Sequence, residues 1–198
     1  FGGDIDIADK IVHTGDTNTA IRFPAADTVS AETGGSERIR IDSSGRLLVG
    51  HTSTVDTSTY NSNFQLMGTD AHGSSATIGR FSADASASSI HFSKSRNGTK
   101  GSHTVVQDND GIGNIFWWAS DGSDYEEVAR IGAEIDGTPG SGDTPGALTF
   151  NTTADGASTV TERLRIDSGG DVTFKGASSD GKWDRSADAF VANVTGNV

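Results

Sequence analysis

The chain has 198 residues and few aliphatic and aromatic side chains: 33% of the residues are hydrophobic, and 26 are glycine. It therefore has too little apolar material for one large core, and it must be thin and layered or complete its core with copies of itself. The net charge of −12 argues against partners such as nucleic acid phosphates or anionic membranes. No apolar run approaches the roughly 20 residues of a membrane helix.

Cysteine is absent, which rules out disulfides and thiolate zinc sites within the chain. The sequence begins Phe1-Gly2-Gly3, without an initiator methionine or a signal sequence. We therefore expect the chain to be the ordered part of a longer protein.

Alternating charged and apolar residues predict strands in the first quarter of the chain. Residues 4–12 alternate acids with aliphatics, and residues 19–23 form a short strand that Pro24 ends. After residues 29–33, the stretch Glu37–Val49 alternates, breaks at a Ser/Gly turn and alternates again. This pattern is typical of a β-hairpin with one apolar face.

The hairpin stretch returns as Glu162–Phe174, 125 positions after Glu37. The apolar face of the two copies, which we interpret as a hairpin and trimer core, consists of Ile39, Ile41, Leu47, Val49, Leu164, Ile166, Val172 and Phe174. Four such side chains per copy are too few to stabilise an isolated hairpin, so the face needs partners. Leu48 lies on the opposite face, together with the arginines of each copy. We expect a neighbouring chain or the insert to cover Leu48, and its counterpart Thr173 to face water.

Between the hairpins lie a Thr/Ser/Asn-rich connector, residues 51–63, and an insert, residues 64–160. Strand signals separated by Gly, Asn and Asp turns predict an antiparallel, sandwich-like insert. The expected strands are residues 64–67, 76–81, 89–95, 104–106, 113–119, 125–135 and 147–151. Residues 113–119 are apolar on both faces, so we expect this strand to be central. Residues 123–134 also show helical spacing, but their alternation is cleaner and favours a strand.

The sequence thus predicts an elongated all-β chain whose hairpins flank an insert. Its expected parts are an N-terminal segment with the first hairpin (1–50), the connector (51–63), the insert (64–160), the second hairpin (161–176) and a C-terminal shaft segment (177–198). The ending Asn193–Val198 begins a four-residue repeat with one valine per unit. Three chains around one axis could form a core from such a repeat, whereas a single chain could not.

Catalytic and metal-binding sets are not evident. A glycosidase needs two carboxylates about 5–10 Å apart, but most of the 27 acids lie in turns, where aspartate is favoured. No two of the five histidines have the spacing of a metal clamp. The pairs Asp4/Asp6 and Asp108/Asp110 offer oxygen ligands to Ca²⁺ but lack a later bidentate glutamate. We expect no catalytic residue, cofactor or resident metal within one chain. Whether three chains hold a Ca²⁺ ion on their threefold axis is an open question at this point.

Three aromatic residues are candidate glycan contacts, because exposed rings stack on the CH faces of sugars: Trp117, Trp118 and Tyr125. The competing interpretation is core or inter-subunit packing, since an indole buries a large apolar area. Trp183 is expected to pack between subunits at a shaft junction.

Several segments of the sequence are familiar as a set: Asp9–Pro24, Glu37–Gly50, Gly132–Gly140 with Pro145–Phe150, Trp183–Ser186 and Asn193–Gly196. Together they resemble tail-fibre-like virion proteins of marine tailed bacteriophages, a hairpin-repeat fibre family. The resemblance implies homotrimeric, intertwined β-fibres at the phage surface that usually contact the host. It also implies that longer members carry a self-cleaving C-terminal folding domain, which no segment here resembles.

The residues and the resemblance together predict a non-enzymatic structural component of a phage tail fibre that mediates or supports host-cell attachment. The expected partners are copies of the chain itself, other virion tail proteins and a host surface glycan or receptor. Nucleic acid binding and membrane insertion are not expected. Two alternatives remain open: a glycan-cleaving tailspike, and a head-decoration or adaptor fibre without receptor contact.

Overall fold

The structure is a computed structural model that describes residues 3, 5–57, 61–177 and 179–192. The regular structure in these ranges is entirely β, with thirteen strands in two sheets. The described residues include no helix that could cross a membrane. The chain divides into two compact units, residues 1–88 and 89–198, and this boundary falls inside the segment 64–160.

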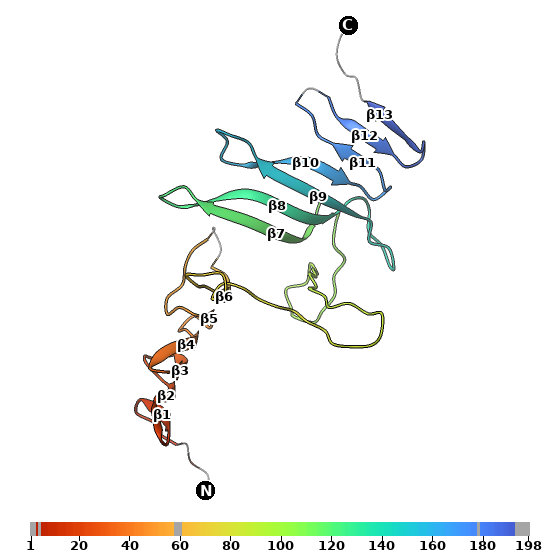
Figure 1. Cartoon of the computed structure of the whole chain (residues 1–198). Helices are drawn as coiled ribbons and strands as arrows, with labels where there is room; N and C mark the ends of the chain where they lie inside the picture. The colour runs from red at the N-terminus through yellow and green to blue at the C-terminus, as the bar shows by residue number, and fades with distance from the viewer. Residues whose placement is uncertain (1–2, 4, 58–60, 178, 193–198) are drawn as a thin grey trace. The chain divides into compact units, whose positions relative to one another are not determined.

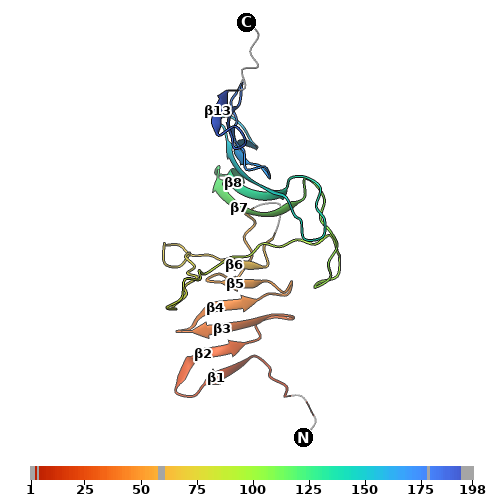
Figure 2. The same ribbon diagram turned by 90° about the vertical axis from the view of Figure 1, so that its right-hand side faces the viewer.

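The first unit contains a six-stranded sheet whose strands follow one another in chain order (Figure 2). The strands are β1 (Lys10–His13), β2 (Asp16–Arg22), β3 (Val29–Thr33), β4 (Ser36–Ile41), β5 (Leu47–Val49) and β6 (Phe64–Leu66). Neighbouring strands are antiparallel except for β5 and β6, which run parallel. The first hairpin therefore lies within a larger meander.

The second unit contains a seven-stranded antiparallel meander (Figure 1). Its strands are β7 (Gly111–Ser120), β8 (Tyr125–Ile135), β9 (Gly146–Thr153), β10 (Val160–Ile166), β11 (Val172–Phe174), β12 (Gly181–Asp184) and β13 (Ala189–Ala192). The strand interpretation of residues 125–135 is confirmed.

Both predicted hairpins are present, and their turns are identical in design. The Oδ1 atom of Asp42 accepts hydrogen bonds from the N–H groups of Ser44 and Arg46. In the same way, Oδ1 of Asp167 accepts hydrogen bonds from the N–H groups of Gly169 and Asp171. Gly45 and Gly170 supply the left-handed backbone, with φ of 77° and 85°, that an L-residue adopts only at a cost. The repeated Asp-x-x-Gly sequence therefore specifies the turn locally.

The repetition extends beyond the hairpin that the sequence reveals. A bulge in each hairpin strand skips one arginine in the register, Arg38 in β4 and Arg163 in β10. Each arginine donates from Nε to a threonine Oγ1 on the preceding strand, at 2.9 Å to Thr33 and at 3.0 Å to Thr152. The strands β3 and β9 thus belong to the repeat although their sequences differ.

The same correspondence continues through five strands. One cross-strand row in the first sheet is Ile11–Ile21–Ala31–Ile39–Val49, and its equivalent in the second sheet is Ile115–Ile131–Phe150–Leu164–Phe174. The strands β1–β5 and β7–β11 are therefore two copies of one meander. The sheets diverge at the next strand, because β6 adds in parallel and β12 in antiparallel.

Leu48 is 0% exposed and is the largest fully buried side chain among the described residues. It lies between Arg40 and Gln65 in the register of β4, β5 and β6, and Gln65 binds the backbone of Val55 through both amide atoms. Segments of the same chain, including insert strand β6, therefore cover Leu48. Its counterpart Thr173 is half-buried in the single chain, so it is more exposed than Leu48, and its contact with water in an assembly stays a prediction.

Several predicted strands are not found. Residues 76–81, 89–95 and 104–106 belong to no strand, and the first strand begins at Lys10 instead of residue 4. Alternation marks a segment that suits a strand, but a strand also needs a neighbouring backbone. Residues 76–81 and 89–95 have no such neighbour in the described part of the single chain. Residues 104–106 have one backbone bond across the loop, from the Arg96 N–H to the Thr104 carbonyl at 3.2 Å, which is too little for a strand pair.

Two further predictions are wrong for the single chain: that residues 113–119 form a central strand, and that the insert forms a separate sheet. Strand β7 lies at the edge of its sheet, with β8 as its one neighbour. The insert forms no sheet of its own, because β6 joins the first hairpin and β7–β9 join the second. Local alternation identified these strands, whereas long-range pairing decided their neighbours. The ending Asn193–Val198 lies outside the described residues.

Candidate functional site

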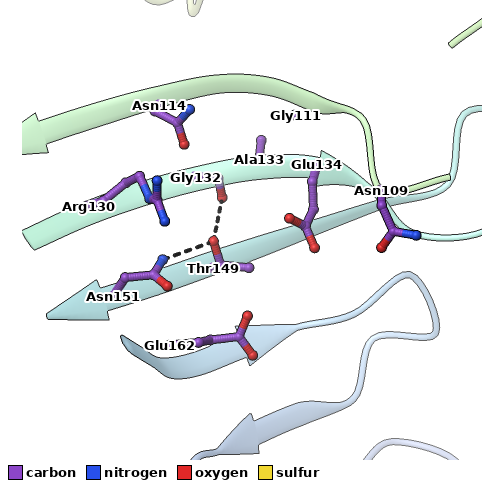
Figure 3. Close-up of a pocket in the computed structure, with 10 residues that line it drawn as sticks. All are labelled: Asn109, Gly111, Asn114, Arg130, Gly132, Ala133, Glu134, Thr149, Asn151 and Glu162. Carbon is purple, nitrogen blue, oxygen red and sulfur yellow. Dashed lines mark hydrogen bonds between the residues drawn. The ribbon is translucent and has the colours of Figure 1, made fainter. Parts of the chain in front are cut away.

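The second sheet carries a polar pocket of about 370 Å³ on one face, across strands β7–β10 (Figure 3). Its lining is almost entirely polar: Asn109, Gly111, Asn114, Arg130, Gly132, Ala133, Glu134, Thr149, Asn151 and Glu162. Directly paired residues of adjacent antiparallel strands lie on the same face. The register Asn114–Gly132–Thr149 therefore brings amide and hydroxyl groups from three strands together.

Gly132 forms the floor of this pocket. A Cβ at this position would lie 2.7 Å from Asn114 Oδ1 and 3.1 Å from Thr149 Oγ1, so a larger residue would fill the hollow. Thr149 is buried and donates to the Gly132 carbonyl at 3.5 Å, while Asn151 Nδ2 donates to Thr149 Oγ1 at 3.2 Å. Because glycine has no side chain, there is room for a ligand atom between the neutral polar groups of Asn114 and Thr149.

The carboxylates at the rim are already paired. Arg165 contacts Glu134 at 2.7 Å, Asp136 at 2.8 Å and Glu162 at 3.3 Å. A guanidinium that neutralises these carboxylates weakens their attraction for a cation. Among the described residues, no three His, Cys, Asp or Glu side chains could share a metal ion. The pocket is therefore suited to neutral hydroxyl and amide groups.

An aromatic group borders the pocket face. The rings of Phe116 and Trp118 lie 5.9 Å apart, and the guanidinium of Arg130 lies 5.7 Å from the centre of the Phe116 ring in cation–π geometry. Tyr125 pairs with Ser120, whose side chain shares this face with Trp118 by strand alternation. Two of the three candidate glycan contacts, Trp118 and Tyr125, thus share the pocket face.

Trp117 points to the opposite, apolar face, where it pairs with Ala129 beside the row that contains Ile115. Trp117 is 47% exposed and Ile115 is 49% exposed. Further exposed apolar side chains on this face are Leu148, Ile166, Phe174 and Phe190. Trp183 packs edge-on against Phe190 at 5.4 Å, so its ring has a partner within its own chain.

The first sheet has an equivalent apolar face, formed by Ile11, Ile21, Val29, Ile39, Ile41, Leu47 and Phe64, all exposed. The register pairs Ile39 with Val49 and Ile41 with Leu47. In the second hairpin it pairs Leu164 with Phe174 and Ile166 with Val172. The eight predicted core residues therefore share one face in each copy, and their burial by other chains stays a prediction.

Two of the acids considered for Ca²⁺, Asp108 and Asp110, bind protein donors. Asp110 accepts hydrogen bonds from Nε and Nη2 of Arg96, each at 2.7 Å, and contacts Lys94 at 3.0 Å. The Arg96 bonds hold the pKa of Asp110 far below its usual range. Asp108 accepts the N–H of Gly137 at 2.8 Å. These bonds occupy carboxylate lone pairs that a calcium ion would need. Asp4 lies outside the described residues.

Little in the sequence indicates the pocket. Its polar residues come from strands that are remote in sequence, so no local motif contains them. One local signal exists: Gly132 interrupts an otherwise alternating strand, and a glycine within a strand often marks a bulge or a close approach.

No protein-family model matches this sequence, and no curated protein sequence is significantly similar to it. Among solved structures, the fold is similar to the carboxy-terminal domain of the bacteriophage T5 L-shaped tail fibre, with a TM-score of 0.57 and 14% sequence identity. The similarity covers 83% of this chain and 74% of that one. A structure of that fibre domain with its intramolecular chaperone domain has a TM-score of 0.49 at 12% identity, over 83% of this chain and 51% of the other.

Proposed function

We propose that this chain is a non-enzymatic structural segment of a bacteriophage tail fibre. In this proposal three copies form an intertwined homotrimer at the virion surface, which mediates or supports attachment to the host cell. The exposed apolar face on each of the two sheets carries the proposal. The fold likeness to a T5 tail-fibre domain supports it, and the resemblance of Glu37–Gly50 and its companion segments favours the hairpin-repeat fibres of marine phages.

The need for other copies follows from how little a single chain buries. Among the described residues, five hydrophobic side chains are buried: Ala20, Leu48, Val106, Ile135 and Ala147. A stable domain of this length normally buries most of its large apolar side chains, because hydrophobic burial offsets the loss of chain entropy. The two apolar faces carry many of the large apolar side chains that stay exposed in the single chain. Equivalent faces of other copies would cover them.

The polar pocket supports the attachment part of the proposal. If the apolar faces turn toward the other copies, the opposite face of the second sheet stays in water. That face offers the neutral groups of Asn114, Thr149 and Asn151 beside the ring of Trp118. Hydroxyl-rich host glycans fit such groups, because amides bond hydroxyls and rings stack on sugar CH faces.

Two measurements test the function. Mass photometry of the purified protein is expected to give three chain masses, and a monomer would contradict the assembly. Labelled antibody against the chain is expected to decorate the tail fibres of intact virions. Label on the head would favour the decoration or adaptor alternative instead. Release of reducing sugar from host polysaccharide would overturn the non-enzymatic assignment.

A further inference from the structure

Strand β7 has an open edge that is poorly protected against pairing. It is ten residues long, contains no charged residue or proline, and pairs on one side with β8. Its side chains are apolar on both faces, and Ile115, Phe116 and Trp117 are all exposed. Native proteins usually shield such an edge with charges, prolines or short strands. An edge of this kind is a template for another strand.

The same unit contains a strand-like segment without a partner. Residues 89–95 alternate Ile90 and Phe92 with polar residues, and these two side chains are 70% and 53% exposed. Over the described residues, no hydrogen bond joins the backbone N–H groups of residues 87–94 to any acceptor. The segment nevertheless has a fixed end, because Arg96 and Lys94 both pair with Asp110.

The segment does not pair with β7 of its own chain. A Cβ at Gly113 would lie 2.5 Å from the Phe92 Cβ, so Phe92 packs on the start of β7. Gly113 pairs with Ala133 and lies on the face that carries Ile115. The segment therefore crosses this face at Gly113, near the start of β7. The edge of β7 beyond Asn114 has no strand beside it in the single chain.

We propose that residues 89–95 of one copy add as a strand to the open edge of β7 in a neighbouring copy. This β-augmentation places β7 between two strands, which suits a strand that is apolar on both faces. It also gives the backbone of residues 89–95 and the exposed side chain of Ile90 a partner. The inference rests on the proposed homotrimer, because donation from each copy to the next closes a ring at three copies.

Charge favours another copy of this chain as the partner. Residues 85–107 contain Lys94, Arg96 and Lys100 and no acid, whereas the whole chain has a net charge of −12. Acids lie one strand away from the receiving edge: Glu126 and Glu127 of β8 pair with Ala119 and Trp118 of β7. Lys94 and Arg96 are paired with Asp110 of their own chain. The donor region, with Lys100 and no acid of its own, is therefore repelled less by an acidic second copy than the rest of the chain would be.

Hydrogen–deuterium exchange of the assembled protein tests the donation. The amides of residues 89–95 are expected to exchange at least about tenfold more slowly than in a free peptide of the same sequence. Those β7 amides that point away from β8 are expected to be protected as well. A trimer in which residues 89–95 exchange at the peptide rate would overturn strand donation alone. A monomer by mass would overturn the proposed assembly itself.

A proline substitution gives a second readout. Ser93→Pro removes an N–H that the ladder needs but breaks no hydrogen bond within the single chain. It is expected to lower the assembled fraction and to unprotect the β7 edge. Ala87→Pro, just outside the donated segment, is the matched control and is expected to behave like the parent. Equal exchange at β7 in Ser93→Pro and the parent trimer would contradict the proposal.

Discussion

Aspartate carboxylates accept backbone N–H groups at several turns of this chain. Asp42 and Asp121 each accept two such groups within the next four residues. These bonds favour the ionised form, so the backbone N–H of Arg46 and that of Asp124 hold the pKa of Asp42 and Asp121 below its ordinary value. Part of the strong acidity of the sequence therefore stabilises turns.

Because the pKa of Asp136 is lowered in the folded chain, we expect a measurable loss of stability in acid. The Ser168 N–H and the Arg165 guanidinium lower the pKa of its carboxyl from 3.8 to about 2. A depressed pKa stabilises the fold above the unfolded pKa, and this contribution disappears as the pH falls from about 4 to about 2. We expect a loss on the order of 1 kcal/mol of unfolding free energy, after allowance for solvent screening.

Urea unfolding at several pH values between 6 and 2 measures this effect. Asp136→Asn is expected to unfold more easily than the parent at pH 6 and to show a smaller further loss toward pH 2. Asp155→Asn, in an exposed turn, is the control and is expected to follow the parent. Parallel curves for Asp136→Asn and the parent would contradict the assignment.

The two adjacent tryptophans are expected to have different roles because they lie on opposite faces. Trp118→Ala is expected to reduce host adsorption while the protein stays trimeric, since its ring borders the polar pocket. Trp117→Ala is expected to weaken assembly by on the order of 2 kcal/mol per chain, because its half-exposed ring lies on the apolar face. Adsorption assays and mass photometry on both variants measure these effects. Loss of the trimer in Trp118→Ala would instead mark Trp118 as core.

At the scale of elements, the chain repeats a five-stranded meander, and only its hairpin is visible in the sequence. The turn residues recur because they carry a backbone requirement that few other residues meet. The strands β3 and β9 differ in sequence yet keep one register and one Arg–Thr bond beside the bulge. Strand positions accept many residues that suit a pleated, half-buried surface. The two sheets can therefore share one pairing register although their strand sequences differ.

The two turn glycines predict unequal responses to the same substitution. Gly45→Ala meets no atom within 4 Å, so its cost is the strain of positive φ, about 1 kcal/mol. Gly170→Ala bears the same strain, and its Cβ would also lie 2.7 Å from Arg185 Cδ. Chemical denaturation is therefore expected to show a larger loss for Gly170→Ala. An equal or smaller loss would mean that Arg185 moves aside freely.

At the scale of the whole molecule, the apolar faces predict how assembly responds to a buried charge. Ile41 is 48% exposed in the single chain, so Ile41→Asp is expected to leave the fold of one chain largely intact. In a trimer it would place three carboxylates in an apolar interface, which is strongly unfavourable. Mass photometry at micromolar protein is expected to show the trimer fraction reduced about tenfold or more. Ser43→Asp, in the exposed turn, is the control, and an unchanged trimer in Ile41→Asp would contradict the interface.

The sequence by itself determined the features that depend on near neighbours along the chain. Alternation and Asp-x-x-Gly turns specified both hairpins and the face shared by Ile41 and Leu47, because period-two alternation and turn geometry are local. Only the tertiary structure decided which strands are neighbours: β7 lies at an edge, residues 89–95 stay unpaired, and Gly132 lies beneath Asn114. These outcomes depend on hydrogen bonding between remote segments, which periodicity cannot specify.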